Sequence, residues 1–237
     1  LLRKHALTIL PSVSSLKALR RDAKASRAEK PYLGVGNPLL EGPDGRYARL
    51  AKQAREKKAC PPTAQQKARA GSLSGRSGIR QVMISGGLAD LAHVRAQMPL
   101  PETADELCAV SRQLRAGDGD VRLGARASEG DLKALNERGM LSQYRVLHFA
   151  THGALAGEMS GSAEPGLILT PPEQATARND GYLSASEVAG LKLGADWAIL
   201  SACNTAAGGT DNAEALSGLA RAFFYAGARA LLVSHWA

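Results

Sequence analysis

The apolar positions of this chain follow two spacings, one suited to buried strands and the other to amphipathic helices. Short apolar runs that end in Gly, Pro or small polar residues occur at 31–38, 144–150, 196–202 and 230–234, and they are typical of strands inside a sheet. Between these runs the apolar residues recur at helical spacing. Strands that alternate with helices predict an α/β fold, in which a mainly parallel central sheet is flanked by helices.

Several helix boundaries carry their own sequence signals. In a capping box, a Ser or Thr side chain caps the helix start and a residue three positions later caps it in return. Gly139 and Gly227 suit helix ends, because glycine readily adopts the left-handed conformation found there. The predicted starts are Thr103 with Glu106, Ser128 with Asp131, and Ser184 with Glu187, the last with Leu183 and Val188 as a hydrophobic staple.

The charge of the chain is concentrated in one stretch. The formal net charge is +8, yet residues 46–80 alone hold ten basic residues against one acid, Glu56. Because apolar periodicity is weak there, residues 42–80 are predicted to be a flexible, solvated insertion, or else a poorly packed helix. The rival interpretation is contact with an anionic polymer through this insertion. No aromatic residue follows Tyr47 in it, so base stacking is unsupported and a nucleic-acid partner is not expected.

Composition indicates an ordinary globular protein. The chain has 237 residues, of which 44% are hydrophobic and 22% charged, which suits one main α/β domain with a packed core. No window has the roughly 18 to 20 apolar residues of a membrane span, and the start lacks the order of a signal peptide, so we expect a cytoplasmic location. Because the chain starts inside an apolar segment and stops at SHWA, we expect a fragment truncated at both ends.

The three cysteines, Cys60, Cys108 and Cys203, lack the spacing of a metal site, and their odd number argues against a disulfide framework. We therefore predict free thiols. Neither a metal nor a cofactor is expected.

Two of the predicted strands end in reactive side chains. YRVLHFATHG reaches His152 and DWAILSACNT reaches Cys203. Because all carboxyl ends of a parallel sheet lie on one edge, these residues can meet across neighbouring strands. A cysteine thiol has a pKa of about 8.5 and needs a base, which His152 would supply, while backbone N–H groups of Gly153 and Cys203 would stabilise an oxyanion.

A succession of segments resembles the CHAT domain, a caspase-like cysteine peptidase family related to caspases and separases. The segments are VLHFATHG, PGLILTPP, GYLSASEVAGLKL, WAILSACNTA and EALSGLARAFFYAGARALLVSHW, and weaker similarity reaches the N-terminal part, so the resemblance is to a single domain over residues 1–237. It implies a caspase-like three-layer sandwich. It also implies that His152 and Cys203 form the peptidase dyad.

The resemblance implies a hydrolase, namely a cysteine endopeptidase that cleaves a protein substrate through a thioester acyl-enzyme. Caspase specificity for aspartate is not inherited, because Cys203 lacks the flanking glutamine and arginine of the caspase signature. Family context suggests a role in bacterial signalling or defence, with tetratricopeptide-type repeats or another regulator outside this fragment. A catalytically silent CHAT-like interaction module is the main alternative.

Four acidic residues are candidates for substrate contact. Asp211 and Glu214 follow the Gly208–Gly209 pair, and they would either cap the next helix, which is favoured, or form an acidic wall for a basic substrate residue. Glu164 and Asp180 lie between the two catalytic strands and have weaker support. His148 would face the same side of the sheet as His152, and we interpret it as a core histidine.

Overall fold

The structure is a computed structural model, and it describes residues 26–62, 82–85, 88–154, 159–160, 164–201 and 210–233. Within these ranges, residues 82–85, 159–160 and 210–217 are described by their backbone only.

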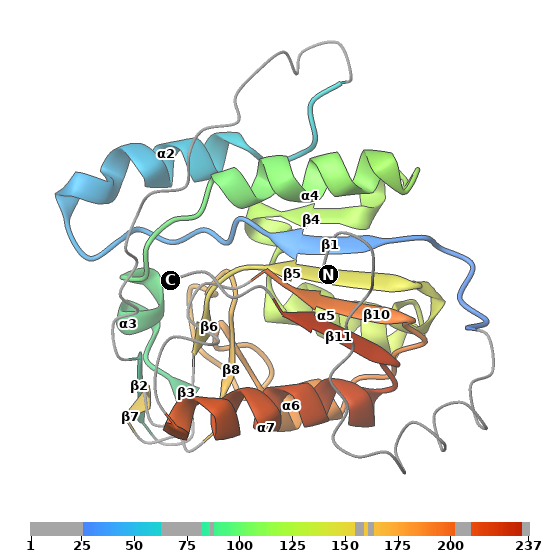
Figure 1. The fold of residues 1–237 in the computed structure, drawn as a ribbon. Coiled ribbons are helices and arrows are strands. Elements are labelled where there is room, and N and C mark those ends of the chain that lie inside the picture. The colour runs from blue at the N-terminus through green and yellow to red at the C-terminus, as the bar shows by residue number, and fades with distance from the viewer. Residues whose placement is uncertain are drawn as a thin grey trace.

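The central sheet has five parallel strands in the order β11-β10-β5-β1-β4 (Figure 1). This order makes β5 and β10 neighbours, although about fifty residues separate them in sequence. The four strands expected from apolar runs are all in this sheet, so the prediction of a mainly parallel sheet is confirmed. The strands are β1 (Leu33–Gly36), β4 (Val121–Leu123), β5 (Val146–Ala150), β10 (Trp197–Leu200) and β11 (Ala230–Val233).

Helices cover both faces of the sheet, which completes the three layers of a caspase-like sandwich. Figure 1 shows α2 and α4 above the sheet, with α6 and α7 below it. Leu132 and Leu135 of α5 share a core with Phe149 and Leu200 on the lower face. The helices are α2 (Ala48–Glu56), α3 (Leu91–Arg95), α4 (Glu102–Gln113), α5 (Glu129–Glu137), α6 (Ala185–Ala189) and α7 (Thr210–Ala226).

Strand β1 shows why α4 lies so close to the sheet. Its sequence LGVG alternates, so Leu33 and Val35 join the lower core while Gly34 and Gly36 face α4. A Cβ atom on Gly36 would lie 2.7 Å from Leu107 of α4, and one on Gly34 would lie 2.9 Å from the Tyr32 ring. The two glycines therefore make the room in which α4 and the Tyr32 ring pack.

Two small sheets flank the carboxyl edge of the central sheet. One has the order β3-β2-β7 and the other β6-β8-β9. Strand β6 begins directly after His152 and pairs with β8, which in turn pairs with β9. Their bounds are β2 (Val82–Ser85), β3 (Leu88–Ala89), β6 (Gly153–Ala154), β7 (Met159–Ser160), β8 (Gly166–Ile168) and β9 (Tyr182–Ser184).

Two of the three predicted helix starts are confirmed. The Ser128 hydroxyl accepts a hydrogen bond from the Asp131 N–H at the start of α5. Ser184 and Glu187 form a reciprocal capping box at the start of α6, and the staple residues Leu183 and Val188 are both buried. Gly139 and Gly227 have φ of +68° and +110°, as their predicted place after a helix requires.

The capping box predicted at Thr103 and Glu106 is wrong. Helix α4 begins earlier, at Glu102, with Pro101 at its N-cap position. Thr103 is then inside the first turn, where its hydroxyl donates to the Leu100 carbonyl oxygen and accepts from the Asn37 N–H. Glu106 therefore does not cap the helix start, and its carboxylate lies near His148 of the sheet.

Of the two structures expected for residues 42–80, a solvated insertion or a helix, the first part contains a helix. A short 3₁₀ turn at Gly45–Tyr47 leads into α2, whose Ala51 and Ala54 are almost fully buried. The sequence pattern offered this helix only as an alternative, because its buried face consists of small alanines instead of large apolar residues. Residues 63–81 lie outside the described residues.

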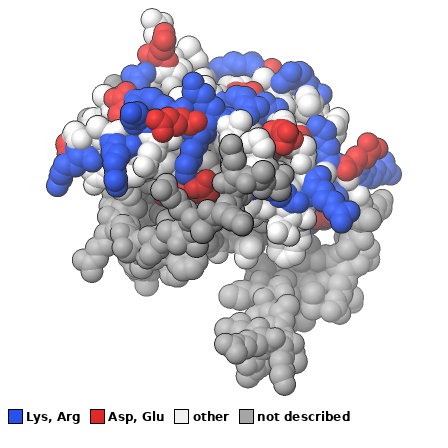
Figure 2. Space-filling model, turned by 90° about the horizontal axis from the view of Figure 1, so that it is seen from above, with Lys and Arg blue, Asp and Glu red and all other residues white. Residues whose placement is uncertain are grey.

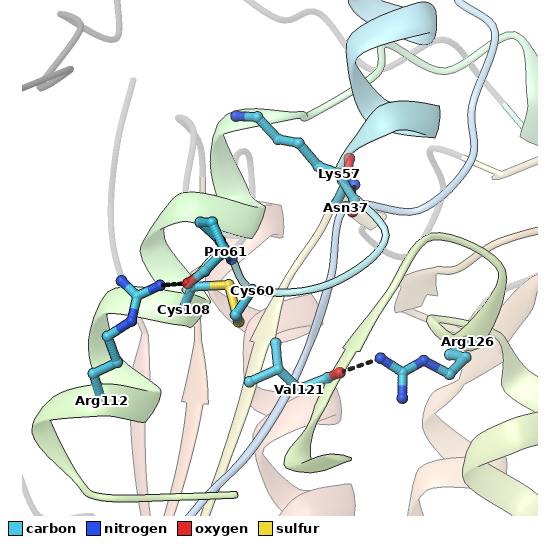
Figure 3. The surroundings of a disulfide bond; sticks show 8 residues. All are labelled: Asn37, Lys57, Cys60, Pro61, Cys108, Arg112, Val121 and Arg126. Carbon is cyan, nitrogen blue, oxygen red and sulfur yellow. Dashed lines mark hydrogen bonds between the residues drawn. A yellow bond between two sulfur atoms is a disulfide. The ribbon is translucent and has the colours of Figure 1, made fainter. Parts of the chain in front are cut away.

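The prediction of three free thiols is also wrong, because Cys60 and Cys108 form a disulfide. Figure 3 shows this bond joining the chain after α2 to α4. Beside it, the Arg112 guanidinium donates to the Pro61 carbonyl oxygen at 2.6 Å. Cysteine spacing cannot predict such a pair, because the two residues meet only through the packing of two helices.

Helices long and apolar enough to cross a bilayer do not occur in the described part of the chain.

Candidate functional site

The two strands that lead to the predicted dyad lie side by side. Strands β5 and β10 are parallel, with Ile199 opposite His148 and Leu200 opposite Phe149. The ladder continues past β10, since the Ser201 N–H donates to the Phe149 carbonyl oxygen at 2.8 Å. His152 and Ser201 therefore leave the sheet at the same edge. Residues 202–209, which include Cys203, lie outside the described residues.

The His152 side chain is held by a backbone carbonyl. Its Nε2 lies 2.7 Å from the carbonyl oxygen of Met98, in the segment between α3 and α4. Because a carbonyl can only accept, Nε2 carries the proton and Nδ1 of the neutral ring is left as a base. Nδ1 is buried and has no hydrogen-bond partner among the described residues. The ring is thus fixed in the tautomer that a general base on Nδ1 requires.

Burial determines the charge of His152. The residue is only 1% exposed, and desolvation lowers its pKa below the ordinary value, although the Met98 carbonyl works in the opposite direction. The ring is therefore neutral at neutral pH, which is the state in which it can accept a proton.

The residues around His152 are fixed by the neighbouring small sheet. The Thr151 hydroxyl donates a hydrogen bond to the carbonyl oxygen of Ile168. The N–H of Ile168 in turn donates to the carbonyl oxygen of His152 at 2.9 Å. Gly153 is buried in β6 opposite Leu167. The role of Gly153 and Cys203 as oxyanion donors stays a prediction.

Two of the acidic candidates have structural partners. Glu164 accepts a hydrogen bond from the Ser186 N–H at the start of α6. Asp180 accepts from the Ala89 and Tyr182 N–H groups at 2.7 and 2.9 Å. These bonds explain both carboxylates without a substrate, and their predicted contact with substrate remains untested.

Asp211 and Glu214 lie in the first turns of α7, which begins at Thr210. The position agrees with helix capping, since acidic residues stabilise the positive end of a helix. Their side chains lie outside the described residues, so the rival acidic wall stays a prediction.

A second buried histidine, His148, belongs to a polar group that we call the α4 cluster: Tyr32, Glu106, His148 and Ser201. The Tyr32 hydroxyl lies 3.0 Å from His148 Nδ1. His148 Nε2 lies 3.2 Å from Glu106 Oε1, an ion-pair distance whose alignment falls short of a hydrogen bond. The Ser201 hydroxyl helps to lower the pKa of the same Glu106 carboxylate. His148 is 3% exposed, in agreement with its interpretation as a core histidine.

Sequence reasoning missed Met98 and the role of Glu106. A carbonyl has no residue signature, although the run PLP at 99–101 could have indicated a stiff segment, because each residue before a proline is restricted to extended conformations. Glu106 was assigned to a capping box, and only the tertiary structure directs it at His148.

Neither a metal-binding group nor the hollow at the amino edge of the sheet adds to this site. Among the described residues, no three His, Cys, Asp or Glu side chains gather as metal ligands. A hollow of about 550 Å³, lined by residues such as Trp197 and Ala230, lies where β10 and β11 begin. It is at the amino edge of the sheet, opposite the edge at which parallel sheets bind ligands.

The basic residues on α2 do not form a uniform patch. Figure 2 shows the face above α2 and α4, where Lys and Arg side chains are interspersed with acidic ones. Several basic residues have acidic partners, and the pairs are Arg46 with Asp44, Arg55 with Glu41, and Lys57 with Asp105. The described part of this surface is therefore mixed in charge, and contact of the basic stretch with an anionic polymer stays an untested alternative.

Comparison with known proteins gives one match. A family model described as the CHAT domain matches residues 1–237. No curated protein and no solved structure matches the chain.

Proposed function

Because the chain belongs to the CHAT domain family, whose fold is caspase-like, we propose that it is a cysteine endopeptidase with Cys203 as nucleophile and His152 as general base. One observation carries the proposal: the neutral His152 ring is held through Nε2 by Met98, and its Nδ1 lacks a partner among the described residues. A buried nitrogen without a partner costs free energy, which favours a functional reason for it.

The sheet supports the pairing of the two residues. Adjacent parallel strands bring His152 and Ser201 to the same edge, and Cys203 follows Ser201 by two residues. A cysteine at this edge needs a base within hydrogen-bond reach to become a thiolate at neutral pH. Nδ1 is the atom of His152 that remains for this task.

The proposed reaction proceeds in two steps. Cys203 Sγ attacks the carbonyl carbon of a substrate peptide bond while its proton passes to His152 Nδ1. The C–N bond then breaks, the proton moves to the departing amine, and a thioester joins Cys203 to the acyl group. Water, deprotonated by His152, attacks the thioester and releases the acid and the thiol. Backbone N–H groups of Gly153 and Cys203 are the proposed oxyanion donors.

The test uses peptidyl ketone electrophiles that differ in the residue preceding the electrophile, since specificity is open. Of the three cysteines, Cys60 and Cys108 are bonded to each other, so one label per chain is expected, on Cys203. Cys203→Ala should abolish labelling, and His152→Ala should slow it about 100-fold or more. Equal labelling of Cys203 in wild type and His152→Ala would exclude the dyad and favour the silent interaction module.

A further inference from the structure

We propose that a hollow between the end of α2 and the ends of β1 and β4, which we call the α2 hollow, binds a small organic anion with an apolar body. An aryl phosphate and an aryl carboxylate both have this chemistry. The hollow has a volume of about 430 Å³, which suits a small ligand. The residues that the argument uses are the apolar Leu39, Leu123 and Ala125 and the cationic Arg55, Lys58 and Arg126. The site is separate from His152 and does not depend on the proposed peptidase activity.

The α2 hollow lies at the carboxyl edge of the central sheet, where open α/β sheets bind their ligands. Leu39 follows β1 by three residues, and Leu123 is the last residue of β4. Strand β1 separates β4 from β5, whose end leads to His152. The hollow and His152 are therefore on the same edge of the sheet but at the ends of different strands.

Hydrogen bonds fix the walls of the α2 hollow relative to one another. The Thr170 hydroxyl accepts from the Leu39 N–H at 2.9 Å and donates to the Gly124 carbonyl oxygen at 2.8 Å, so it joins the segments after β1 and β4. The Asn37 side-chain amide donates to two carbonyl oxygens at the end of α2, at 2.9 and 3.1 Å. Because both bridging side chains are buried, the shape of the hollow exists before a ligand arrives.

The apolar wall indicates a ligand with an apolar body. Leu39 is only partly buried, whereas both of its neighbours in sequence are buried, and Ala125 is exposed. Gly124 leaves space beside Leu39, since a Cβ atom on Gly124 would lie 3.6 Å from Leu39 Cδ2. An aromatic or aliphatic group in this space would remove apolar surface from water, which favours binding.

The cationic wall indicates that the ligand is an anion. Arg55 and Lys58 belong to the end of α2 and Arg126 to the turn after β4, so positive charges line the hollow from two sides. Lys58 and Arg126 have no ion pair among the described residues. The partner of Arg55 is Glu41, at 4.0 Å, and both side chains are more than half exposed. A bound anion would reduce the mutual repulsion of these three cations.

Arg126 is held in place before a ligand binds. Its Nη2 donates to the Val121 carbonyl oxygen at 3.0 Å, as Figure 3 shows. A guanidinium has five N–H donors, so this bond leaves donors that can bind a carboxylate or a phosphate. A side chain that is already positioned loses less conformational entropy when it binds.

The experiment measures the affinity of the protein for four probes by isothermal titration calorimetry. The probes are 2-naphthyl phosphate, 2-naphthoate, inorganic phosphate and the neutral 2-naphthylmethanol. We expect a naphthyl anion to bind about tenfold more tightly than 2-naphthylmethanol, which lacks the charge, and than inorganic phosphate, which lacks the apolar body. Tighter binding of 2-naphthyl phosphate would assign the site to a phosphate ester, and tighter binding of 2-naphthoate would assign it to a carboxylate.

Variants locate the binding in the α2 hollow. Lys58→Gln and Arg126→Gln should each weaken the naphthyl anion about threefold to tenfold, and Leu39→Ala should weaken it by a similar factor. Lys52→Gln is the matched control, because it removes an exposed positive charge of α2 outside the hollow, and it should bind as wild type does. Thermal unfolding verifies that each variant is folded. The exposed Lys58→Gln decides the matter if Arg126→Gln is not folded.

Three results would overturn the proposal. The first is that neither naphthyl anion binds at concentrations up to about 5 mM. The second is that 2-naphthylmethanol binds as tightly as the anions, and the third is an unchanged affinity in Lys58→Gln together with Leu39→Ala. Amide chemical shifts provide an independent reading, since the bound anion should shift the signals of Leu39, Leu123 and Gly124. Shifts confined to another part of the protein would also reject the site.

Discussion

Each face of the central sheet buries a cluster of polar side chains, and the two clusters differ in how many of their polar atoms have hydrogen-bond or ion-pair partners. Below the sheet, Glu129, Lys133 and Glu187 form what we call the α5–α6 cluster. Lys133 Nζ contacts Glu129, lies 2.8 Å from Glu187, and donates to the Arg178 carbonyl oxygen at 2.9 Å. Above the sheet, the α4 cluster has an exposed carboxylate edge and an imperfectly aligned His148.

The difference indicates what each cluster does. Glu129 is 1% exposed, and its second oxygen accepts from two N–H groups of the turn before β9. Hydrogen bonds from Lys133 and Ser184 overcome the effect of burial on Glu187 and lower its pKa. Every charged group of the α5–α6 cluster has a partner, although burial still raises the pKa of Glu129 to about 7. Removing one partner should therefore destabilise the fold, whereas the less complete α4 cluster adjoins the edge where His152 and Ser201 leave the sheet.

The largest effect should come from Glu129→Ala. The change leaves Lys133 partly buried without its nearest carboxylate and removes the acceptor for the 180–181 turn, so we expect a loss of about 3 kcal/mol in the free energy of unfolding. Urea denaturation measures it. Labelling of the folded protein at Cys203 should be unchanged.

The control for this change is Glu137→Ala, because Glu137 and Arg178 form an exposed ion pair. Its urea midpoint should equal that of wild type. A wild-type midpoint for Glu129→Ala, or a loss of labelling at unchanged stability, would remove the contrast between the two clusters.

Loss of the disulfide should have the next largest effect, and it tests how α4 is held independently of Glu106. The bond joins residues 48 positions apart, so the double variant Cys60→Ser/Cys108→Ser should lose about 2 to 4 kcal/mol of unfolding free energy. Each single variant should show a similar loss, because one serine already breaks the bond. A stability equal to that of wild type would mean that helix packing alone holds the segment after α2.

Burial of the neutral His152 ring should make the free energy of unfolding depend on pH. Its pKa is lowered in the folded protein, so below pH 6.5 the unfolded chain binds a proton that the folded chain resists. Relative to His152→Gln, wild type should lose stability as the pH falls from 7 to 5, by at most about 1.4 kcal/mol per pH unit. Urea denaturation at several pH values measures this, and a constant difference would contradict the neutral buried ring.

The smallest effect concerns the cap that borders the α5–α6 cluster. Ser184→Ala removes the N-cap of α6 and one hydrogen bond to Glu187, and it should cost about 1 kcal/mol. The exposed Ser186→Ala is the control and should match wild type in thermal unfolding. Equal melting of both variants would show that the capping box contributes nothing.

Most of the sheet and two helix starts could be predicted from the sequence, because their signals are local. The apolar run VLHFA indicates a strand, and the capping pair Ser184 and Glu187 indicates a helix start, each within a few residues. Helix α2 was expected only as an alternative, because Ala51 and Ala54 make a small buried face. The disulfide was not predicted, because only packing brings Cys60 to Cys108.

The candidate site was predicted only in part for the same reason. His152 and Cys203 were found at the ends of apolar strands and from family motifs, and the structure confirms that β5 and β10 are neighbours. The carbonyl of Met98 has no side-chain signature, and the direction of Glu106 depends on where α4 begins.

The sequence by itself determined the α/β pattern, the CHAT family and the two residues most suited to the chemistry, because periodicity and short motifs are written in neighbouring positions. Only the tertiary structure decided the tautomer and charge of His152 and the contacts of Glu106. Those properties arise from burial and from partners that are distant in sequence. Met98 lies 54 residues before His152, and Glu106 lies 42 residues before His148.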